Sequence, residues 1–398
     1  MRWVVIFLMT AGAALAGPYR DGVLYPATPE ARITALTAFY ADWKATYLRE
    51  TCGTGRAVVD VGADGKWVGG GSADNTLTVS EAHGYGMLIL VLMADRDPDA
   101  RRLFDAMLAY RDDHPAGSHP GLMAWNQLTN CENAGADVGG DHSATDGDLD
   151  VAFALLLAAK RWPDGGYDAR ALDVVAGTLA EVKAASADFL TIGDWAQKDV
   201  IYSATTRSSD FMPSHFRAFA AASDDEVWTA ILDQTYMAFD TAGSDELGLV
   251  PDFITEMPDA PAPAEALFLE GEGDGAHSWN AVRVPWRLAL DDLLFSEPRA
   301  HQRLLSLNAF IQGATRGDPD KIRDGYVLTG QPLHPDWGGG MAFAAMFAVA
   351  AMCDPDGQAW LDALWNHLLD TPLAADDYYG NTLKLLALIT LAGLWDQP

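Results

Sequence analysis

The sequence has few basic residues for its length. Its 398 residues include 26 Lys and Arg against 56 Asp and Glu, which gives a formal net charge of −30. No cluster of Lys and Arg is present that could follow a phosphate backbone, so the sequence predicts no nucleic-acid partner. An acidic surface attracts a cationic ligand and repels an anionic one, although solubility alone also explains such a charge.

Cysteine is scarce as well. Only three cysteines occur, none of them in a CxxC pair, and the nine histidines form no HExxH pattern, so a zinc site has no support. We expect no metal ion and no other cofactor. In an exported protein Cys52 and Cys131 are able to pair, whereas Cys353 lies in an apolar stretch typical of a buried side chain. The sequence leaves this disulfide open.

Long hydrophobic runs are absent after the N-terminus. Residues 1–16, MRWVVIFLMTAGAALA, combine Arg2, an apolar run and a small-residue cleavage pattern. They predict a secretory signal peptide, with an uncleaved anchor as the alternative. Later apolar segments are shorter or rich in alanine and fit core helices. We therefore predict a secreted or periplasmic protein whose mature chain, residues 17–398, is one domain without membrane contact.

Strand patterns are sparse, whereas helical periodicity returns along the whole chain. Alternating β-branched residues occur only near 57–61 and 198–203. The Pro/Ala stretch 257–266 shows no change of composition on either side, so we interpret it as a surface loop. The pattern favours one all-α, closed array of helix hairpins whose loops converge on a cleft. The predicted helices are 30–50, 80–96, 98–111, 148–162, 168–186, 213–222, 224–241, 285–295, 298–312, 339–352, 356–369 and 378–394.

The segment TVSEAHGYGMLILVLMADR, residues 78–96, begins its predicted helix in an unusual way. Ser80 suits an N-cap before Glu81, and a carboxylate there suits the helix dipole, so an ordinary capped helix is one interpretation. Capping does not explain Gly84 and Gly86, since each costs about 1 kcal/mol relative to alanine inside a helix. Glycine is kept where something approaches the backbone closely. We hypothesise that a ligand lies across this helix start, within reach of Glu81.

A second acidic helix start lies in SATDGDLDVAFALLLAAKRW, residues 143–162. Thr145 or Asp146 suits the cap of this helix, and Asp148 and Asp150 follow in its first turns. Capping and the helix dipole explain part of this crowding. Because Asp146 and Asp148 need not share a face, the crowding also favours one carboxylate that faces the cleft.

Both segments resemble signatures of glycoside hydrolase family 8. The run ATDGD at 144–148 is similar to one signature, with Val151 where Ile or Met is usual. The run SEAHGYGM is similar to the segment around the catalytic acid, with Ala82 in place of Gly. Further similar segments are LMAW, SSDFMPSHFRAF, GLVPDF, NAVRVPWR and YYGNTLKLLALITLAGLW, spread over residues 30–396. The resemblance implies an (α/α)6 barrel with an open cleft and endo-acting, inverting hydrolysis of β-linked glycans.

The resemblance also implies catalytic roles. Glu81 corresponds to the acid, which needs a raised pKa to stay protonated, and Asp146 to the aspartate that binds the sugar in the −1 subsite. Asn280 stands where the best-known members have the base aspartate, and an amide accepts no proton from water. In the branch that includes chitosanases, lichenases and some endoglucanases, a Glu on an upstream insertion is the base. Glu270 matches that Glu, with Glu272 as the substitute.

Further side chains are candidates for substrate binding. Trp67 and Trp125 lie in polar, loop-like surroundings, where aromatic rings are able to stack on sugars. The matching family positions imply that others orient groups near the reacting sugar, although Arg283 is equally suited to pair with an acid. The complete set of substrate-binding candidates is Trp67, Tyr85, Trp125, Asp148, Asp210, Asn280, Arg283 and Tyr326.

The sequence thus predicts a secreted, monomeric endo-β-1,4-glycanase that acts on a polysaccharide, with chitosan and β-glucan nearly level as substrates. One alternative is a glycan-binding protein of the same fold that has lost catalysis, for which Asn280 is the motive. Another is a helical-barrel lyase or epimerase, for which His83 and Tyr85 form a weak version of the required set.

Overall fold

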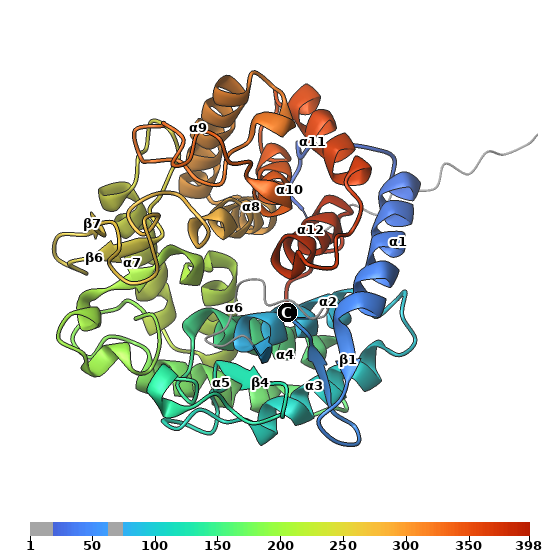
Figure 1. Cartoon of the computed structure of the whole chain (residues 1–398), viewed down its shortest axis with the longest axis vertical. Helices are drawn as coiled ribbons and strands as arrows, with labels where there is room; N and C mark the ends of the chain where they lie inside the picture. The colour runs from blue at the N-terminus through green and yellow to red at the C-terminus, as the bar shows by residue number, and fades with distance from the viewer. Residues whose placement is uncertain (1–18, 63–74) are drawn as a thin grey trace, which may run out of the picture.

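The computed structural model describes residues 19–62 and 75–398 and shows a ring of helices (Figure 1). Residues 1–16, the predicted signal peptide, and Trp67 lie outside the described residues. No helix within the described part is long and apolar enough to cross a membrane. Twelve α-helices occur there: α1 (Pro29–Tyr47), α2 (Ser80–Leu92), α3 (Ala100–Asp113), α4 (Thr145–Arg161), α5 (Tyr167–Glu181), α6 (Pro213–Ser223), α7 (Val227–Ala242), α8 (Val284–Phe295), α9 (Pro298–Thr315), α10 (Gly340–Ala351), α11 (Gln358–Asp370) and α12 (Tyr378–Leu391).

The even-numbered helices form the inner wall of a barrel. Each of them, from α2 to α10, contacts the next even-numbered helix, and α12 contacts α2, which closes the ring. The odd-numbered helices pack outside, with α3 against α2 and α1 against α12, for example. This double ring is the (α/α)6 barrel that the sequence predicts.

Burial patterns explain which helices lie inside. In α10 every residue from Met341 to Ala351 is buried, so this helix has no polar face to turn toward water. The outer helix α3 buries one apolar stripe together with Arg111, and it leaves the rest of its charged face toward solvent. Helices that are apolar all round need neighbours on every side, and the inner ring supplies them.

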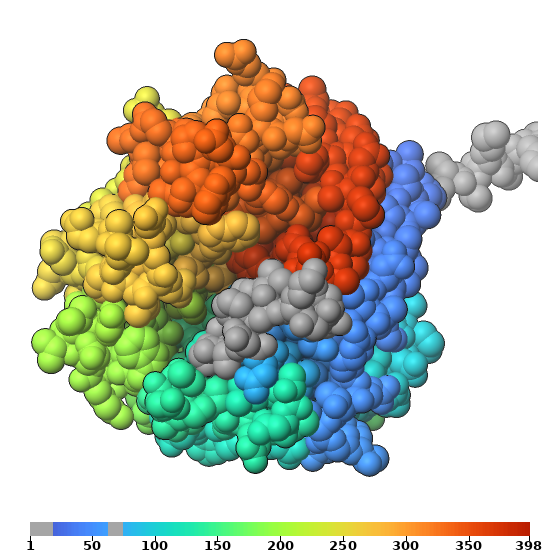
Figure 2. Space-filling view, viewed as in Figure 1, coloured from blue at the N-terminus to red at the C-terminus, as the bar shows by residue number. Residues whose placement is uncertain are grey.

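The short β-strands all belong to loops and pair antiparallel. Strand β1 (Leu48–Glu50) pairs with β2 (Ala57–Val59), and β3 (Thr76–Val79) pairs with β4 (Asn126–Leu128). Strand β6 (Phe253–Thr255) lies between β5 (Thr206–Arg207) and β7 (Ala262–Pro263). The predicted surface loop 257–266 therefore carries an edge strand of this barrel domain. Figure 2 shows the surface of one face, on which segments coloured teal, green, yellow and orange follow one another around the molecule.

The predicted helices agree with the observed ones to within a few residues, but one predicted strand is wrong. The segment near 57–61 contains β2, as expected. Residues 198–203 instead contribute to two 3-10 turns, η2 (Ala196–Lys198) and η3 (Tyr202–Ala204). The Asp199 carboxylate accepts the backbone N–H groups of the residues two and three positions later, which folds the chain into a turn.

Gly84 and Gly86 serve helix packing. A Cβ added to Gly84 would lie 2.7 Å from Asp150 Cβ and 3.0 Å from the Gly147 carbonyl oxygen on α4. A Cβ added to Gly86 would lie 2.7 Å from Met107 Cε on α3. The hypothesis that these glycines admit a ligand is therefore wrong, because they allow α2 to approach its neighbouring helices closely.

The predicted side-chain caps of α2 and α4 are also wrong. Ser80 and Thr145 are the first residues of their helices, and no side chain caps either one. The Ser80 N–H donates to the Trp125 carbonyl at 2.9 Å, and the Thr145 hydroxyl donates to the Thr191 carbonyl at 2.6 Å. Backbone carbonyls of neighbouring loops fix these helix starts, so the Asp146 carboxylate is not needed as a cap.

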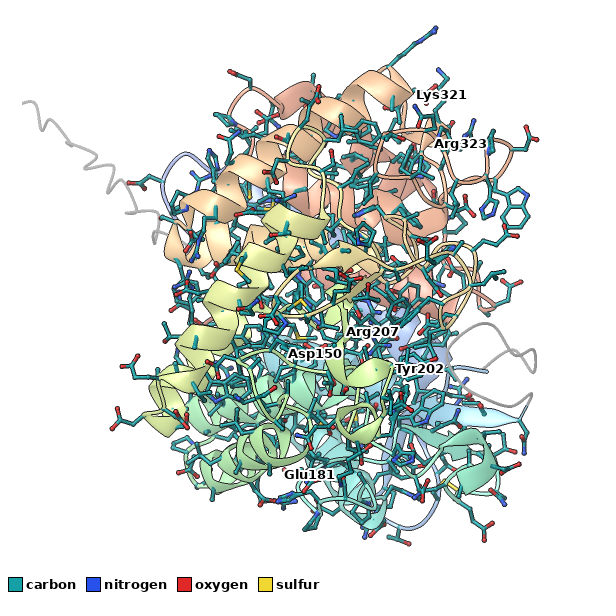
Figure 3. The ribbon with its side chains drawn as sticks, turned by 90° about the vertical axis from the view of Figure 1, so that its left-hand side faces the viewer. Asp150, Glu181, Tyr202, Arg207, Lys321 and Arg323 are labelled. Atoms are coloured by element: carbon teal, nitrogen blue, oxygen red, sulfur yellow. A yellow bond between two sulfur atoms is a disulfide. The ribbon has the colours of Figure 1, made fainter. Side chains whose placement is uncertain are left out.

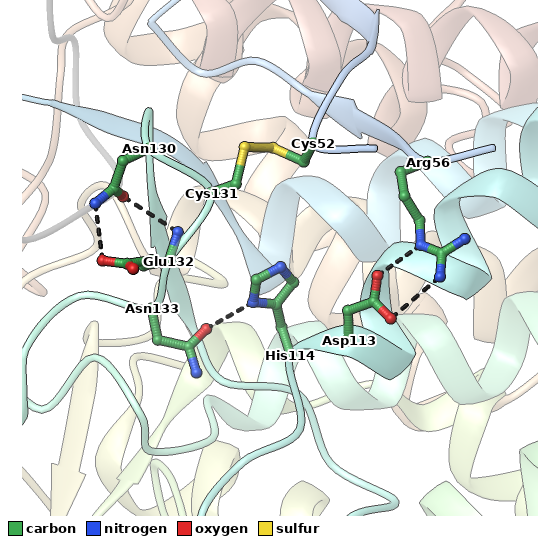
Figure 4. The surroundings of a disulfide bond; sticks show 8 residues. All are labelled: Cys52, Arg56, Asp113, His114, Asn130, Cys131, Glu132 and Asn133. Carbon is green, nitrogen blue, oxygen red and sulfur yellow. Dashed lines mark hydrogen bonds and ion pairs between the residues drawn. A yellow bond between two sulfur atoms is a disulfide. The ribbon is translucent and has the colours of Figure 1, made fainter. Parts of the chain in front are cut away.

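Cys52 and Cys131 form a disulfide, and this open question of the sequence is thereby answered (Figure 4). Their Cα atoms lie 5.6 Å apart. The bond joins the turn after β1 to the turn after β4, beside the strand pair that leads into α2. Cys353 is free and buried, as predicted.

Candidate active site

Glu81 in the first turn of α2 and Asp146 in the first turn of α4 share one arginine. Arg283 ends the 3-10 turn η5 (Ala281–Arg283), which precedes α8. Its Nη1 donates to Glu81 Oε2 at 2.6 Å and to Asp146 Oδ2 at 2.8 Å. The structure thus brings two predicted carboxylates together and gives Arg283 the role of their common partner.

The two carboxylates have opposite pKa shifts. Burial raises the pKa of Glu81 to about 7, with Arg283 opposing this rise and the charge of Asp146 adding to it. Burial also acts on Asp146, but Arg207 and Arg283 together outweigh it and hold its pKa below the usual value. Near neutral pH a large fraction of Glu81 is therefore protonated beside an ionised Asp146, as a general acid requires.

Arg207, at the end of β5, is a site residue that sequence analysis missed. Its Nη2 lies 3.0 Å from Asp146 Oδ1 and 3.1 Å from Asp210 Oδ1, and its Nη1 lies 3.9 Å from Glu270 Oε1. Asp210, which was predicted to bind substrate, is fully buried and instead supports Arg207. In the side view of Figure 3, Arg207 lies toward the loop face and Asp150 lies deeper in the barrel.

Glu270, the predicted base, reaches the site from the loop between β7 and η5. Its Oε2 accepts a hydrogen bond from Asn280 Nδ2 at 2.8 Å, and Asn280 Oδ1 accepts one from Arg283 Nη2 at 2.9 Å. A chain of hydrogen bonds therefore runs from Glu81 through Arg283 and Asn280 to Glu270. The Glu270 side chain is 50% exposed, which leaves part of its carboxylate open to water.

Asp252 fixes the turn that carries Asn280, and sequence analysis overlooked it within the segment GLVPDF. Its buried carboxylate accepts the backbone N–H groups of Ser278, Asn280 and Ala281 at 2.9, 3.1 and 2.7 Å. Burial raises the pKa of Asp252 to about 7, although these N–H groups oppose the rise. A lone aspartate before a strand gives no local sign of such a role.

Three predicted residues lie outside the site. The Glu272 side chain is 74% exposed, and its carboxylate faces a histidine on another loop. Tyr326 is buried, and its hydroxyl accepts a backbone N–H from its own loop, so it has a structural role. Asp148 is fully buried and accepts the Met123 N–H at 2.9 Å. Asp148, predicted to bind substrate, therefore fixes the LMAW loop instead of facing the cleft.

Tyrosines surround the proposed acid. The Tyr378 hydroxyl lies 3.5 Å from Glu81 Oε1, and the predicted Tyr85 accepts a hydrogen bond from Arg283 at 3.4 Å. Tyr379 donates to the Trp279 carbonyl, next to Asn280. The sequence segment beginning YYGNT belongs to the resemblance, but nothing in its helical pattern shows that its first residue, Tyr378, faces Glu81.

Trp125 lies beside the acid. Its carbonyl accepts the N–H of Ser80, the residue before Glu81, and its indole N–H donates to the Gly139 carbonyl at 2.9 Å. The ring is half-buried and thus keeps an accessible part. Its stacking on a sugar ring stays a prediction, as does that of Trp67.

His83 has no place in the site. Its ring is buried, and Nε2 lies 2.8 Å from the Met107 carbonyl oxygen on α3. Burial lowers the pKa of His83 to about 4, so the ring is neutral. The lyase interpretation therefore loses the histidine that it needs.

The arrangement offers a proton donor, a proton acceptor and two arginines around an ionised aspartate. Hydrolysis by two carboxylates needs no further group. Within residues 19–62 and 75–398, no three His, Cys, Asp or Glu side chains are grouped so as to hold a metal ion.

The comparison with known proteins identifies the family. The family model of Glycosyl hydrolases family 8 matches residues 42–393. The chain belongs to glycosyl hydrolase family 8. The (α/α)6 barrel is the fold expected of a glycoside hydrolase in this family.

Relatives of this family 8 enzyme match nearly its whole length. A beta-glucanase of Niallia circulans is 35% identical over 409 residues, which span 98% of this chain and 95% of the relative. An endoglucanase of Bacillus sp. (strain KSM-330) is 31% identical over 95% of this chain and 80% of its own. The apo structure of a beta-1,3-1,4-glucanase from Paenibacillus sp. X4 has a TM-score of 0.87 and 35% identity, and the match covers 96% of this chain and 97% of that one. The family 8 chain is therefore an endo-glycanase with a polysaccharide substrate.

Proposed function

We propose that this family 8 enzyme is an inverting endo-β-1,4-glucanase that cleaves cellulose-type or mixed-linkage β-glucan, with Glu81 as general acid and Glu270 as general base. The observation that carries the proposal is the hydrogen-bond chain from Glu81 through Arg283 and Asn280 to Glu270. An inverting glycosidase needs two carboxyl groups about 6.5–9.5 Å apart, with a water between the base and the sugar.

On the acid side, protonated Glu81 donates to the glycosidic oxygen as the bond to the anomeric carbon breaks. Its pKa of about 7 keeps a large fraction protonated at neutral pH. Ionised Asp146 lies across Arg283 from Glu81 and stabilises the positive charge that develops on the sugar ring.

On the base side, Glu270 takes a proton from the water that attacks the opposite face of the ring. Asn280 donates to Oε2 of Glu270, whereas Oε1 lies 3.9 Å from Arg207 Nη1, beyond hydrogen-bond distance, and is able to accept a proton from that water. The amide at position 280 thus orients a base that another residue supplies. This contact argues against the alternative of a glycan-binding protein that has lost catalysis, because the only motive for that alternative is Asn280.

Two observations favour β-glucan over chitosan. Arg207 and Arg283 both lie at Asp146, where the sugar of the −1 subsite would bind, and their charges would repel a glucosaminium there. The relatives with 35% identity are a beta-glucanase and a beta-1,3-1,4-glucanase. Chitosan is the second candidate, because the net charge of −30 would attract a cationic polymer.

We also propose that the protein is exported. The apolar, signal-like residues 1–16 motivate this proposal, and the disulfide between Cys52 and Cys131 supports it, since disulfides persist mainly in oxidising compartments. Detection of the mature chain in the periplasm or medium, without its first residues, is the corresponding test.

The decisive experiment measures reducing-end release from barley mixed-linkage β-glucan, carboxymethyl-cellulose and soluble chitosan in parallel. We expect the fastest release from a β-glucan, with an early fall in viscosity and products of inverted anomeric configuration by NMR. Faster release from chitosan would mean that chitosan, and not β-glucan, is the preferred substrate. Products with ultraviolet absorbance would indicate a lyase, and no release from any polymer would favour the binding protein.

A further inference from the structure

One buried carboxylate accepts hydrogen bonds from three backbone N–H groups of the turn that carries Glu270. Asp274 is 2% exposed. Its Oδ2 accepts the N–H groups of Leu269 at 2.7 Å and Glu270 at 3.0 Å, and its Oδ1 accepts that of Gly271 at 2.9 Å. Three successive N–H groups thus point at one side chain, as in a tight anion nest.

Phe268 anchors the start of the turn against Phe253 and Tyr202, but the residues around Glu270 have little packing of their own. Leu267 is 72% exposed, and the Glu270 side chain is 50% exposed. A Cβ added to Gly271 would meet no atom within 4 Å. Such a segment is expected to sample several conformations unless polar contacts restrain it, and a base that moves loses its alignment with the attacking water.

Asp274 is itself tied to the sheet beside the site. Its carbonyl accepts the Phe253 N–H of β6 at 2.9 Å, and the Phe253 carbonyl accepts the Ala264 N–H at 3.0 Å. Strand β6 pairs with β5, which carries Arg207. The Asp274 carboxylate therefore connects the Glu270 turn to the same sheet that holds an arginine of the site.

We propose that Asp274 is a positioning residue that fixes Glu270 in its place as the base. The inference rests on the proposed function of Glu270. Asp274 does not touch the sugar or the water; it holds the backbone of the Glu270 turn, while Asn280 holds the Glu270 carboxylate.

The first test replaces Asp274 with Asn. The Asp274→Asn variant keeps the size of the side chain but removes its charge and replaces one acceptor oxygen with a donor that faces backbone N–H groups. We expect kcat on mixed-linkage β-glucan to fall by about 10²-fold, the cost of a misplacement on the order of 1 Å. KM should stay within about 2-fold, because sugar contacts are unchanged. An unchanged kcat would overturn the proposal.

A double-mutant cycle with Glu270→Gln separates positioning from general destabilisation. If Asp274 acts through Glu270, adding Asp274→Asn to Glu270→Gln should lower kcat by less than about 3-fold further. A second full loss of about 10²-fold in that background would show a merely structural role and overturn the inference. If Glu270→Gln keeps the parent activity, the assignment of Glu270 as the base is wrong. That result differs from additive losses in the double variant, which would overturn only the role of Asp274.

Asp97→Asn is the matched control. Asp97 is a buried carboxylate that accepts the Asp99 N–H at 3.0 Å, and it follows the end of α2 that is opposite to Glu81. We expect this variant to lower the urea midpoint with kcat unchanged. Should Asp274→Asn fail to fold, Asp274→Glu replaces it in the same cycle, with the same criterion of additivity, because it keeps the charge on a longer stem.

Discussion

The two carboxylates of the proposed catalytic pair are held in different ways. Glu81 lies in the first turn of an inner helix, 18% exposed, and α2 packs on α4 through the glycine at position 84. Glu270 lies on a loop, 50% exposed, and depends on hydrogen bonds to Asn280 and from its backbone to Asp274. Helix packing holds Glu81 in place, whereas a few hydrogen bonds hold Glu270 in place.

This difference fits the two tasks. A general acid has to stay protonated near neutral pH, and burial within a packed barrel raises the pKa of Glu81 accordingly. A general base has to reach a water molecule that exchanges with solvent, so partial exposure is an advantage for Glu270. Rigid burial thus suits a group that donates a proton, whereas supported exposure suits a group that has to reach water.

The largest expected effect concerns the acid. Glu81→Gln should lower kcat on β-glucan by about 10⁴-fold, because no proton reaches the leaving oxygen. With a dinitrophenyl β-cellobioside, whose leaving group needs no proton, the loss should be much smaller. The measurement compares both substrates at equal enzyme concentration, with the urea midpoint as the control for folding. Equal losses on both substrates would assign Glu81 another role.

Next in size is the effect on the base side. Glu270→Gln should lower kcat by about 10³-fold on both the polymer and the dinitrophenyl substrate, because water activation is needed for each. Glu272→Gln is the matched control, two residues away on the same loop, and should stay within about 2-fold of the parent because its carboxylate is solvent-exposed. If Glu272→Gln lowers kcat more than Glu270→Gln does, Glu272 and not Glu270 is the base.

A smaller effect concerns pH. Since burial raises the pKa of Glu81 to about 7 and its protonated form is active, kcat/KM should fall as pH rises through about 7. Asp146→Asn removes a neighbouring negative charge, so the Glu81 pKa should fall and the basic limb should move to lower pH by about one unit. A series of kcat/KM measurements against pH on the parent enzyme and Asp146→Asn measures this shift. In the control variant Asp97→Asn, the basic limb should stay at the pH of the parent. A limb that moves upward would mean that the charge of Asp146 does not act on Glu81.

The comparison between the two sides also explains what the sequence could predict. Apolar periodicity identified every helix of the barrel, and Glu81 and Asp146 were found because each opens one of those helices. The candidate base, Glu270, was identified only by resemblance, since an acidic, glycine-rich loop is usually a solvated surface. Arg207 was missed because its role depends on an ion pair with a segment distant in sequence, and Asp274 was missed because its hydrogen bonds lie in a turn without periodicity.

Glycine was misinterpreted for a related reason. Inside a helical pattern, Gly84 indicates that something approaches the backbone, but the pattern does not name the approaching group. The structure shows that it is α4, through Asp150 Cβ and the Gly147 carbonyl, and not a ligand. The local sequence shows a glycine that destabilises the helix, but it does not show which segment packs against that glycine.

The smallest expected effect tests this packing on the acid side. Gly84→Ala gains about 1 kcal/mol of helix propensity but forces a Cβ to within 2.7 Å of Asp150 Cβ, and overpacking costs about 1–3 kcal/mol. We expect a lower urea midpoint with KM for β-glucan unchanged. Gly313→Ala in α9 is the matched control, because its added Cβ meets no atom within 4 Å, so it should raise the midpoint. A raised KM with normal stability in Gly84→Ala would instead restore the idea that the sugar chain lies against this glycine.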